Sequence, residues 1–188
     1  MKQLAILGAS GHGKVVAEAA LRSGWDGVEF YDDAWPGKRK AGKWVVSGDT
    51  AALLKALGRF DGVIVAIDGN AIRMEKIAQL QAAGARMATI VHPSAMVSDS
   101  VLLGAGTVVM AGVVINADSV VGVGVILNTS CSVDHDGVLG DGVHIGPGAH
   151  LADGVHVGDL SWVGIGAAVG QGAQIGQGIV LGVGAAVV

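Results

Sequence analysis

An unbroken six-residue repeat in the second half of the chain constrains the fold more than any other feature of the sequence. Stepping by six from Val91 to Val187 meets an aliphatic residue at all seventeen positions. The residue that follows is glycine at nine of them, Gly104 and Gly122 among them. A repeat of this regularity predicts a solenoid, in which each unit buries its apolar face only by stacking on its neighbours.

Strand periodicity gives each position of the repeat a direction. The aliphatic residue and the residue two before it point inward, and the residue between them points outward. The remaining positions, rich in Gly, Asn and Asp, turn a corner. Three repeats then form a triangular coil of 18 residues, so residue n stacks on n+18, and the run makes about five coils. Cys131 falls on an inward position, which predicts core packing.

The outward residues fall on three faces, and one face is apolar along most of its length. A long apolar stripe on a protein surface usually marks an interface, so we expect this face to be buried in an oligomer. His144 lies on it, whereas His150 and His156 belong to the other two faces. Three histidines on three faces cannot converge on one zinc ion. The apolar face consists of Val108, Ile126, His144, Trp162 and Val180.

The first 89 residues have a different construction. Apolar runs and helix signals predict a β-α-β-α-β order, which implies a parallel sheet that binds ligands at the carboxyl ends of its strands. We therefore expect an α/β domain over residues 1–89 and an all-β domain over 90–188. The expected strands cover residues 4–7, 28–31 and 63–67, and the expected helices cover 14–22, 50–57 and 70–83.

Charge separates the same two regions. All twelve Lys and Arg residues lie between Lys2 and Arg86, beside nine acids, whereas residues 91–188 carry seven Asp and no Lys or Arg. Neither region has the dense basic patch of a nucleic-acid-binding protein. Apolar runs are too short to span a membrane, no secretory signal is evident at Met1, and Cys131 is the only cysteine. These features predict a cytoplasmic location.

A glycine loop follows the first expected strand. Gly8, Gly11 and Gly13 place backbone N–H groups at a helix N-terminus, which favours phosphate. A tight turn without a ligand explains the spacing about equally well. Asp32, about two dozen residues further on, stands where an acid meets a ribose or a base. A second βαβαβ half does not fit before residue 90, so we expect a mononucleotide rather than NAD.

Taken together, these motifs resemble the PglD/NeuD-like sugar acetyltransferases. The resemblance rests on Gly-Ala-Ser-Gly-His-Gly at 8–13, Asp32-Asp33, His92-Pro93-Ser94-Ala95, the hexads, Asn128-Thr129-Ser130 and Asp134-His135-Asp136. It implies a left-handed β-helix, a homotrimer with active sites between subunits, acetyl-CoA as co-substrate without a metal, and a nucleotide sugar held by a Rossmann-like N-terminal domain. The family's usual Ala-Ile-Gly-[Asp/Asn]-Asn is Ala66-Ile67-Asp68-Gly69-Asn70 here.

The resemblance also assigns site residues. His135 matches the family's catalytic histidine, with Asp136 after it, His144 matches a second histidine nine residues on, and Asn128 matches an active-site asparagine. The positions expected to bind the nucleotide sugar are Gly8, Ser10, Gly11, His12, Gly13, Asp32, Asp33, Asp68 and Asn128. Those expected to bind acetyl-CoA are His144, Asp153, Gly154, Trp162 and Gly164.

Acyl transfer from a thioester needs a base for the incoming amine or hydroxyl and a stabiliser for the oxyanion. Histidine suits the base because its ordinary pKa is about 6.5, and Asp136 can orient His135. An N–H of residues 152–154, one coil away, is our candidate for the oxyanion. The sequence therefore predicts an N-acetyltransferase acting on a nucleotide-linked amino sugar for surface glycans. O-acetylation of a sialic acid-type sugar and a non-catalytic nucleotide-sugar-binding module are the alternatives.

Overall fold

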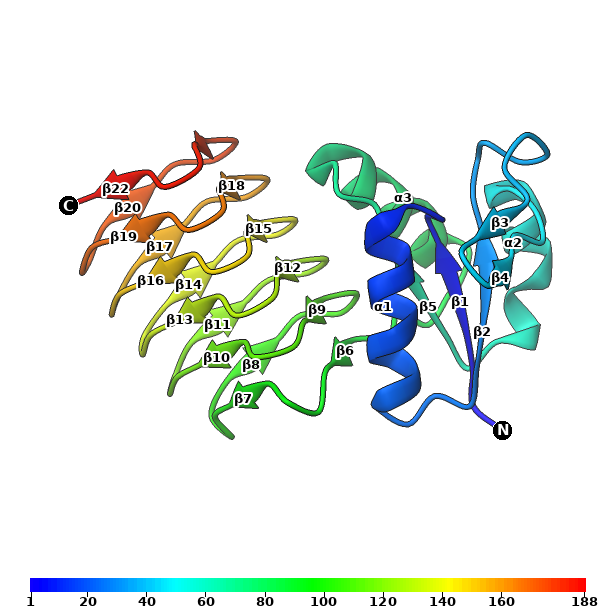
Figure 1. Ribbon diagram of the computed structural model, residues 1–188, viewed down its shortest axis with the longest axis horizontal. Helices are drawn as coiled ribbons and strands as arrows, with labels where there is room; N and C mark the ends of the chain where they lie inside the picture. The colour runs from blue at the N-terminus through cyan, green and yellow to red at the C-terminus, as the bar shows by residue number, and fades with distance from the viewer.

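The computed structural model describes residues 1–188 as an α/β region packed beside a parallel β-helix (Figure 1). The predicted fold class is confirmed. The change of architecture falls at residue 90, where the first strand of the β-helix begins.

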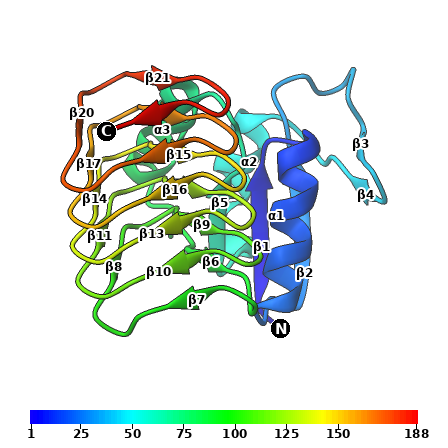
Figure 2. The same ribbon diagram turned by 60° about the vertical axis from the view of Figure 1, so that its left-hand side comes forward.

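Three parallel strands form the N-terminal sheet in the order β2-β1-β5. They are β1 (Gln3–Leu7), β2 (Gly27–Tyr31) and β5 (Gly62–Val65), connected by α1 (Gly11–Arg22), α2 (Thr50–Ala56) with the 3-10 turn η1 (Leu57–Arg59), and followed by α3 (Asn70–Ala82). Helix α1 begins three residues before the prediction because Ser10 caps it, its Oγ accepting the Gly13 N–H. A short hairpin, β3 (Lys40–Ala41) and β4 (Trp44–Val45), was not predicted and projects from the body (Figure 2).

The β-helix consists of two-residue strands that build three parallel sheets. The first sheet holds β6 (Ile90–Val91), β9 (Val108–Val109), β12 (Ile126–Leu127), β15 (His144–Ile145), β18 (Trp162–Val163) and β21 (Val180–Leu181). The second holds β7 (Met96–Val97), β10 (Val114–Ile115), β13 (Ser132–Val133), β16 (His150–Leu151), β19 (Ala168–Val169) and β22 (Ala186–Val187). The third holds β8 (Leu102–Leu103), β11 (Val120–Val121), β14 (Val138–Leu139), β17 (His156–Val157) and β20 (Gln174–Ile175).

Register and direction follow the repeat. Ile126 pairs with His144 and His144 with Trp162, so each residue lies over the one 18 positions away. Inward positions are buried, and Cys131, fully buried among them, has its pKa raised to about 12 by that burial. Every sixth residue from Gly106 to Gly184 has a positive φ. Glycine occupies most of these corners, but Asp118, Ser130, Asp136 and Leu160 do not follow this rule.

The prediction that the apolar face is buried between subunits is wrong for the part of the face that packs within the chain. Ile90, Val108, Ile126 and His144 are each no more than 2% exposed within a single chain, because the N-terminal region packs on the first sheet, with α1 against β6. Only the upper end, with Val180 at 73%, stays exposed. One hydrophobic core runs from β1 into the coils. The buried part of the stripe therefore joins the two parts of one chain and is not a contact between subunits, whereas Val180 at its upper end remains exposed.

No helix of the structure combines the length and the apolar character needed to cross a membrane.

Candidate active site

A hollow of about 370 Å³ opens at the carboxyl ends of β1, β2 and β5, where a parallel sheet binds its ligands. Five of the residues predicted to bind the nucleotide sugar line it. Lys76 and Ile72, from α3, line it too and were not predicted. The predicted residues at the hollow are Gly8, Ser10, Asp32, Asp33 and Asp68.

The glycines of the loop serve different purposes. Gly8 has a φ of +114°, and a Cβ there would lie 2.5 Å from the Ala66 carbonyl oxygen. Gly13 lies against the Gly8 carbonyl, so α1 can follow β1 only without a side chain at that position. A Cβ on Gly11 would meet nothing within 4 Å. The space beside Gly11 is therefore open, in front of amides that have no intrahelical partner.

Two aspartates close the far side of the hollow, and both are already bound. Asp32 accepts hydrogen bonds from the amides of Ala9 (2.7 Å) and Ala34 (3.0 Å) and from Lys38 (3.2 Å). Burial alone would raise its pKa, but these donors hold the pKa below its usual value. Asp32 thus fastens the glycine loop to the end of β2. Oδ1 of Asp32 accepts only the Ala34 amide and keeps a lone pair, so the contact with a ribose or a base stays a prediction.

Asp33 is also engaged. Its Oδ1 accepts the Thr50 amide at 2.8 Å, and its Oδ2 lies 2.6 Å from Nζ of Lys76. Burial raises the pKa of Asp33, yet the bonds from Lys76 and Thr50 outweigh it and lower the pKa. Lys76 lines the hollow beside Asp33, so its ammonium group is the cation available to a phosphate bound there. A lone lysine on a helix gives no signal in the sequence that would single it out.

A second cluster lies where α1 and α3 meet the coils. Nδ1 of His12 is 4.0 Å from Oδ1 of Asp68, and burial lowers the pKa of His12. Nε2 of His144 lies 3.2 Å from Nδ2 of Asn128. The ring of Trp162 packs on that of His144, with centroids 3.9 Å apart. These residues come from α1, from the loop between β5 and α3, and from three successive coils at β12, β15 and β18.

The hydrogen bonds of Asn128 settle the tautomer of His144. Oδ1 of Asn128 accepts the Thr129 amide at 2.8 Å, so its Nδ2 donates to Nε2 of His144 and the ring proton sits on Nδ1. Nδ1 of His144 and Nε2 of His12 are both buried without a partner. Burial, together with the charges on Arg73 and His12, lowers the pKa of His144 to about 3, so the ring is neutral. Contact of His144 and Trp162 with acetyl-CoA stays a prediction.

His135 lies in the corner between β13 and β14, where it is 55% exposed. Its Nδ1 donates to Oδ2 of Asp136 at 2.7 Å, which leaves Nε2 as a free acceptor facing solvent. Asp136 has a φ of +58°, a backbone conformation for which ten of the other thirteen corners use glycine, and its carboxylate lies back against the ring. The bond to Asp136 raises the pKa of His135, and the charges of Asp134 and Asp153 add to the effect.

The backbone hydrogen bonds near residue 153 reduce the number of amides that could stabilise the oxyanion. The Ala152 amide donates to Val169 and the Gly154 amide donates to the carbonyl of His135 at 3.0 Å. Of the three amides proposed, only that of Asp153 is without a backbone acceptor. The Gly164 amide is likewise bound to Leu181, and a Cβ there would meet the Gly182 backbone at 2.6 Å. Gly164 is therefore needed for close coil stacking, whereas Gly154 stands at a corner with a φ of +63°, where a Cβ would come no closer than 3.9 Å to the next coil.

The two groups of site residues lie on different sides of the β-helix. The hollow and the cluster around His144 adjoin the first sheet, whereas the corner between β13 and β14 lies away from the N-terminal region (Figure 1). His144, His150 and His156 stand in three different sheets, as predicted. A single chain therefore does not bring its own His135 to its own glycine loop.

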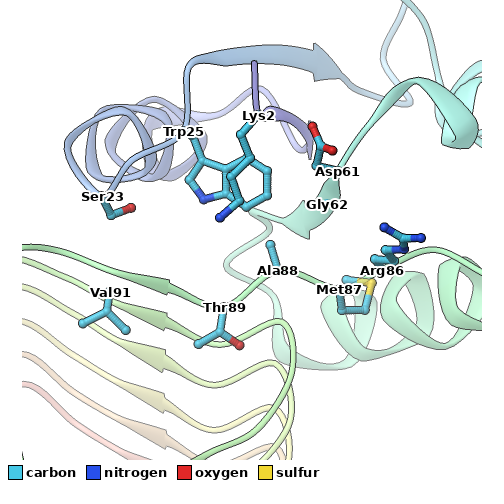
Figure 3. Close-up of a pocket in the computed structure, with 10 residues that line it drawn as sticks. All are labelled: Lys2, Ser23, Trp25, Asp61, Gly62, Arg86, Met87, Ala88, Thr89 and Val91. Carbon is cyan, nitrogen blue, oxygen red and sulfur yellow. The ribbon is translucent and has the colours of Figure 1, made fainter.

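A second hollow, of about 400 Å³, lies at the opposite edge of the N-terminal sheet (Figure 3). Nζ of Lys2 lies 4.5 Å from the centre of the Trp25 ring and covers it. Asp61, at the same hollow, accepts the amide of Gln3. It is formed at the amino ends of β1 and β5, away from the glycine loop, and contributes nothing to the site described above.

The family model described as the PglD N-terminal domain matches residues 3–80. The acetyltransferase domain of PglB from Neisseria gonorrhoeae is 39% identical, with a TM-score of 0.94, over 100% of this chain and 92% of that one. The chain belongs to the PglD-like acetyltransferases of the β-helix superfamily. The family was thus correctly predicted from the glycine loop, the hexads and the Asp-His-Asp corner.

Two further proteins similar to this chain are described by what they bind or acetylate. PerB from Caulobacter crescentus, solved in complex with CoA and GDP-perosamine, is 39% identical with a TM-score of 0.93, over 100% of this chain and 89% of that one. UDP-N-acetylbacillosamine N-acetyltransferase of Bacillus subtilis is 35% identical over 114 residues, which are 59% of this chain. The match spans about half of that curated relative, 52% of its length.

Proposed function

We propose that this protein transfers an acetyl group from acetyl-CoA to the amine of a nucleotide-linked amino sugar. The observation that carries the proposal is the exposed His135, whose Nδ1 is held by Asp136 at 2.7 Å while its Nε2 is free. The hollow at the glycine loop supplies the place for the nucleotide, and relatives that act on such sugars or bind CoA support the assignment. Both substrates are cytoplasmic metabolites, so we assign the reaction to the cytoplasm.

The residues of this chain account for each proton in the reaction. Nε2 of His135 accepts a proton from the sugar amine as its nitrogen attacks the thioester carbonyl. The resulting oxyanion is stabilised by a backbone amide, for which Asp153 offers the free donor. When the C–S bond breaks, the imidazolium returns the proton to the departing CoA thiolate. Asp136 stabilises the imidazolium between the two steps.

Because one chain separates His135 from the glycine loop, we propose that a neighbouring copy completes each site. A closed ring of three copies would place the His135 corner of one copy at the hollow and the His144 cluster of the next. Apolar side chains that remain exposed on the second and third sheets are available for such contacts, among them Met96 (71%), Leu102 (65%) and Val120 (41%).

Mixing two variants that are each inactive when the sugar concentration is far below the KM of Gly11→Glu tests this arrangement. The two variants, His135→Ala and Gly11→Glu, are co-expressed. A His135→Ala chain keeps an unaltered glycine loop, and a Gly11→Glu chain keeps His135. A site is therefore intact only where the first chain provides the hollow and the second provides His135. Random trimers then have about one quarter of their sites intact, and about that share of wild-type activity should return. The control is a protein in which every chain carries both substitutions, and it should stay inactive. If the first mixture also stays inactive while mixed trimers form, each site belongs to one chain.

The activity itself is tested by thiol release from acetyl-CoA with a panel of nucleotide-linked amino sugars. We expect release with at least one amine, and none with the matching sugar that carries a hydroxyl at the amine position. Release with hydroxyl sugars alone would establish O-acetylation instead. Tight nucleotide-sugar binding without release by any acceptor would leave a binding module.

A further inference from the structure

Arg73 is the largest side chain that is completely buried in this protein. It lies on α3, between the N-terminal region and the β-helix, and no carboxylate is bonded to it. Burial lowers its pKa to about 10, so the guanidinium remains charged at neutral pH. A buried charge without an ionic partner is costly and persists only where every donor is satisfied. The acceptors that satisfy the guanidinium therefore indicate what this buried charge holds together.

All five N–H groups of the guanidinium have an acceptor. Nε donates to the carbonyl of Gly124 at 2.7 Å, and Nη2 donates to that of Gly142 at 2.8 Å and to Oδ1 of Asn70 at 2.9 Å. Nη1 donates to the carbonyls of Ile67 and Asp68, each at 2.9 Å. One planar group is thus bonded to the N-terminal region and to the β-helix at the same time.

The acceptors on the β-helix are equivalent positions in successive coils. Gly124 and Gly142 stand 18 residues apart, and each precedes by two residues the outward residue of β12 or β15. Asn70, one turn before Arg73 on α3, extends the series, since its Nδ2 donates to the carbonyls of Leu160 and Ser161 in the next coil. One face of α3 therefore binds three consecutive coils.

The acceptors on the N-terminal region belong to the loop between β5 and α3. Ile67 and Asp68 line the hollow that we assign to the nucleotide sugar. The same guanidinium thus holds the wall of the hollow and the coil that leads to His144. A shift of α3 along the coils would move the bound sugar relative to the acetyl-transfer site.

We propose that Arg73 is a positioning residue for acetyl transfer, which fixes the wall of the sugar hollow against the coils that carry Asn128 and His144. The inference rests on the function proposed above. Reactions between two bound substrates depend steeply on their placement, and a displacement of about 1 Å can cost about 100-fold in rate. Affinity for each substrate depends on local contacts and changes less.

Arg73→Lys and Arg73→Met test the proposal, with kcat, both KM values and the melting temperature measured for each. Lysine keeps the charge but has three donors and no planar fork, so it cannot bind Gly124, Gly142 and the loop together. We expect kcat to fall roughly 10–100-fold in both variants, with the KM for acetyl-CoA within about threefold of wild type. Asn70→Ala, which releases the Leu160 coil and removes one of the five acceptors of Arg73, is a milder variant in case the others fail to fold.

The control is Leu80→Val, which removes packing volume from the same helix two turns beyond Arg73, at a side chain buried in the core of the N-terminal region. It should lower the melting temperature without lowering kcat. If the Arg73 variants lose only thermal stability, or if the sugar KM rises while kcat is unchanged, the positioning role is wrong. A wild-type protein that releases no thiol with any amino sugar would instead contradict the proposed function, and the inference with it.

Discussion

Replacing His135 by alanine is expected to lower kcat by roughly 10²–10⁴-fold, because the sugar amine then loses the base that accepts its proton. The side chain is exposed at a corner and packs on no core residue, so the melting temperature should hardly change. Thiol release at saturating substrates is the measurement, and His156→Ala, an exposed histidine on the third sheet, is the matched control. An undiminished kcat in His135→Ala would assign the base elsewhere.

The pH profile gives a second measurement of the same assignment. Asp136 raises the pKa of His135, so the fraction of neutral base, and kcat with it, should decline as the pH falls through a value above 6.5. Asp136→Asn removes the largest cause of that shift, and the acidic limb should therefore move to lower pH. We expect this variant to lose less kcat than His135→Ala, because the base is still present. A limb that does not move would mean that another group titrates.

Gly11→Glu is expected to raise the KM for the nucleotide sugar about 100-fold or more, with little change in the KM for acetyl-CoA. The position has room for a side chain, so the fold should tolerate it, and an acid in the first turn suits the helix dipole. The new carboxylate would stand where the glycine loop and the amides of α1 favour phosphate, and like charges brought together cost several kcal/mol. Steady-state kinetics with each substrate varied in turn would measure the effect.

Leu21→Glu is the control for Gly11→Glu. Leu21 is 37% exposed near the end of α1, so the variant adds the same charge to the same helix about 15 Å along it from Gly11. Its KM values should match those of wild type. If Gly11→Glu raises the acetyl-CoA KM and leaves the sugar KM unchanged, the two substrate sites are the reverse of those proposed.

The repeat could be predicted almost completely from sequence because every coil uses the same stereochemistry. The inward position of Cys131 and the stacking of Ile126 on His144 follow from a period of six alone. What covers an apolar face does not follow from the period. The pattern shows that Val108 and Ile126 need burial, but a subunit and a domain of the same chain satisfy that need equally well.

The site was predicted in part, for a related reason. Motifs identify groups that stand close in sequence, such as His135 with Asp136 and the loop from Gly8 to Gly13. Arg73 and Lys76 act through contacts with residues far along the chain, and their neighbours carry no motif. A signal for Arg73 existed, because Asn70, Arg73, Ile77 and Leu80 share one helical face, and a charge in that series predicts a buried partner.

The attachment of α3 to three consecutive coils fixes where the N-terminal region sits along the β-helix, whose coils are otherwise alike. Each coil adds about one strand spacing, close to 4.8 Å, along the axis of the β-helix. An insertion or deletion of 18 residues beyond Val163 would therefore lengthen or shorten the molecule and leave the distance between the sugar hollow and the His135 corner unaltered. An insertion of 18 residues between Gly124 and His135 would alter that distance by one step, whereas a deletion of that length there would remove His135 itself. The contacts of Arg73 with Gly124 and Gly142 therefore fix the position of the sugar hollow along the β-helix axis. Only the coils beyond those bound by α3 can vary in number without changing the site.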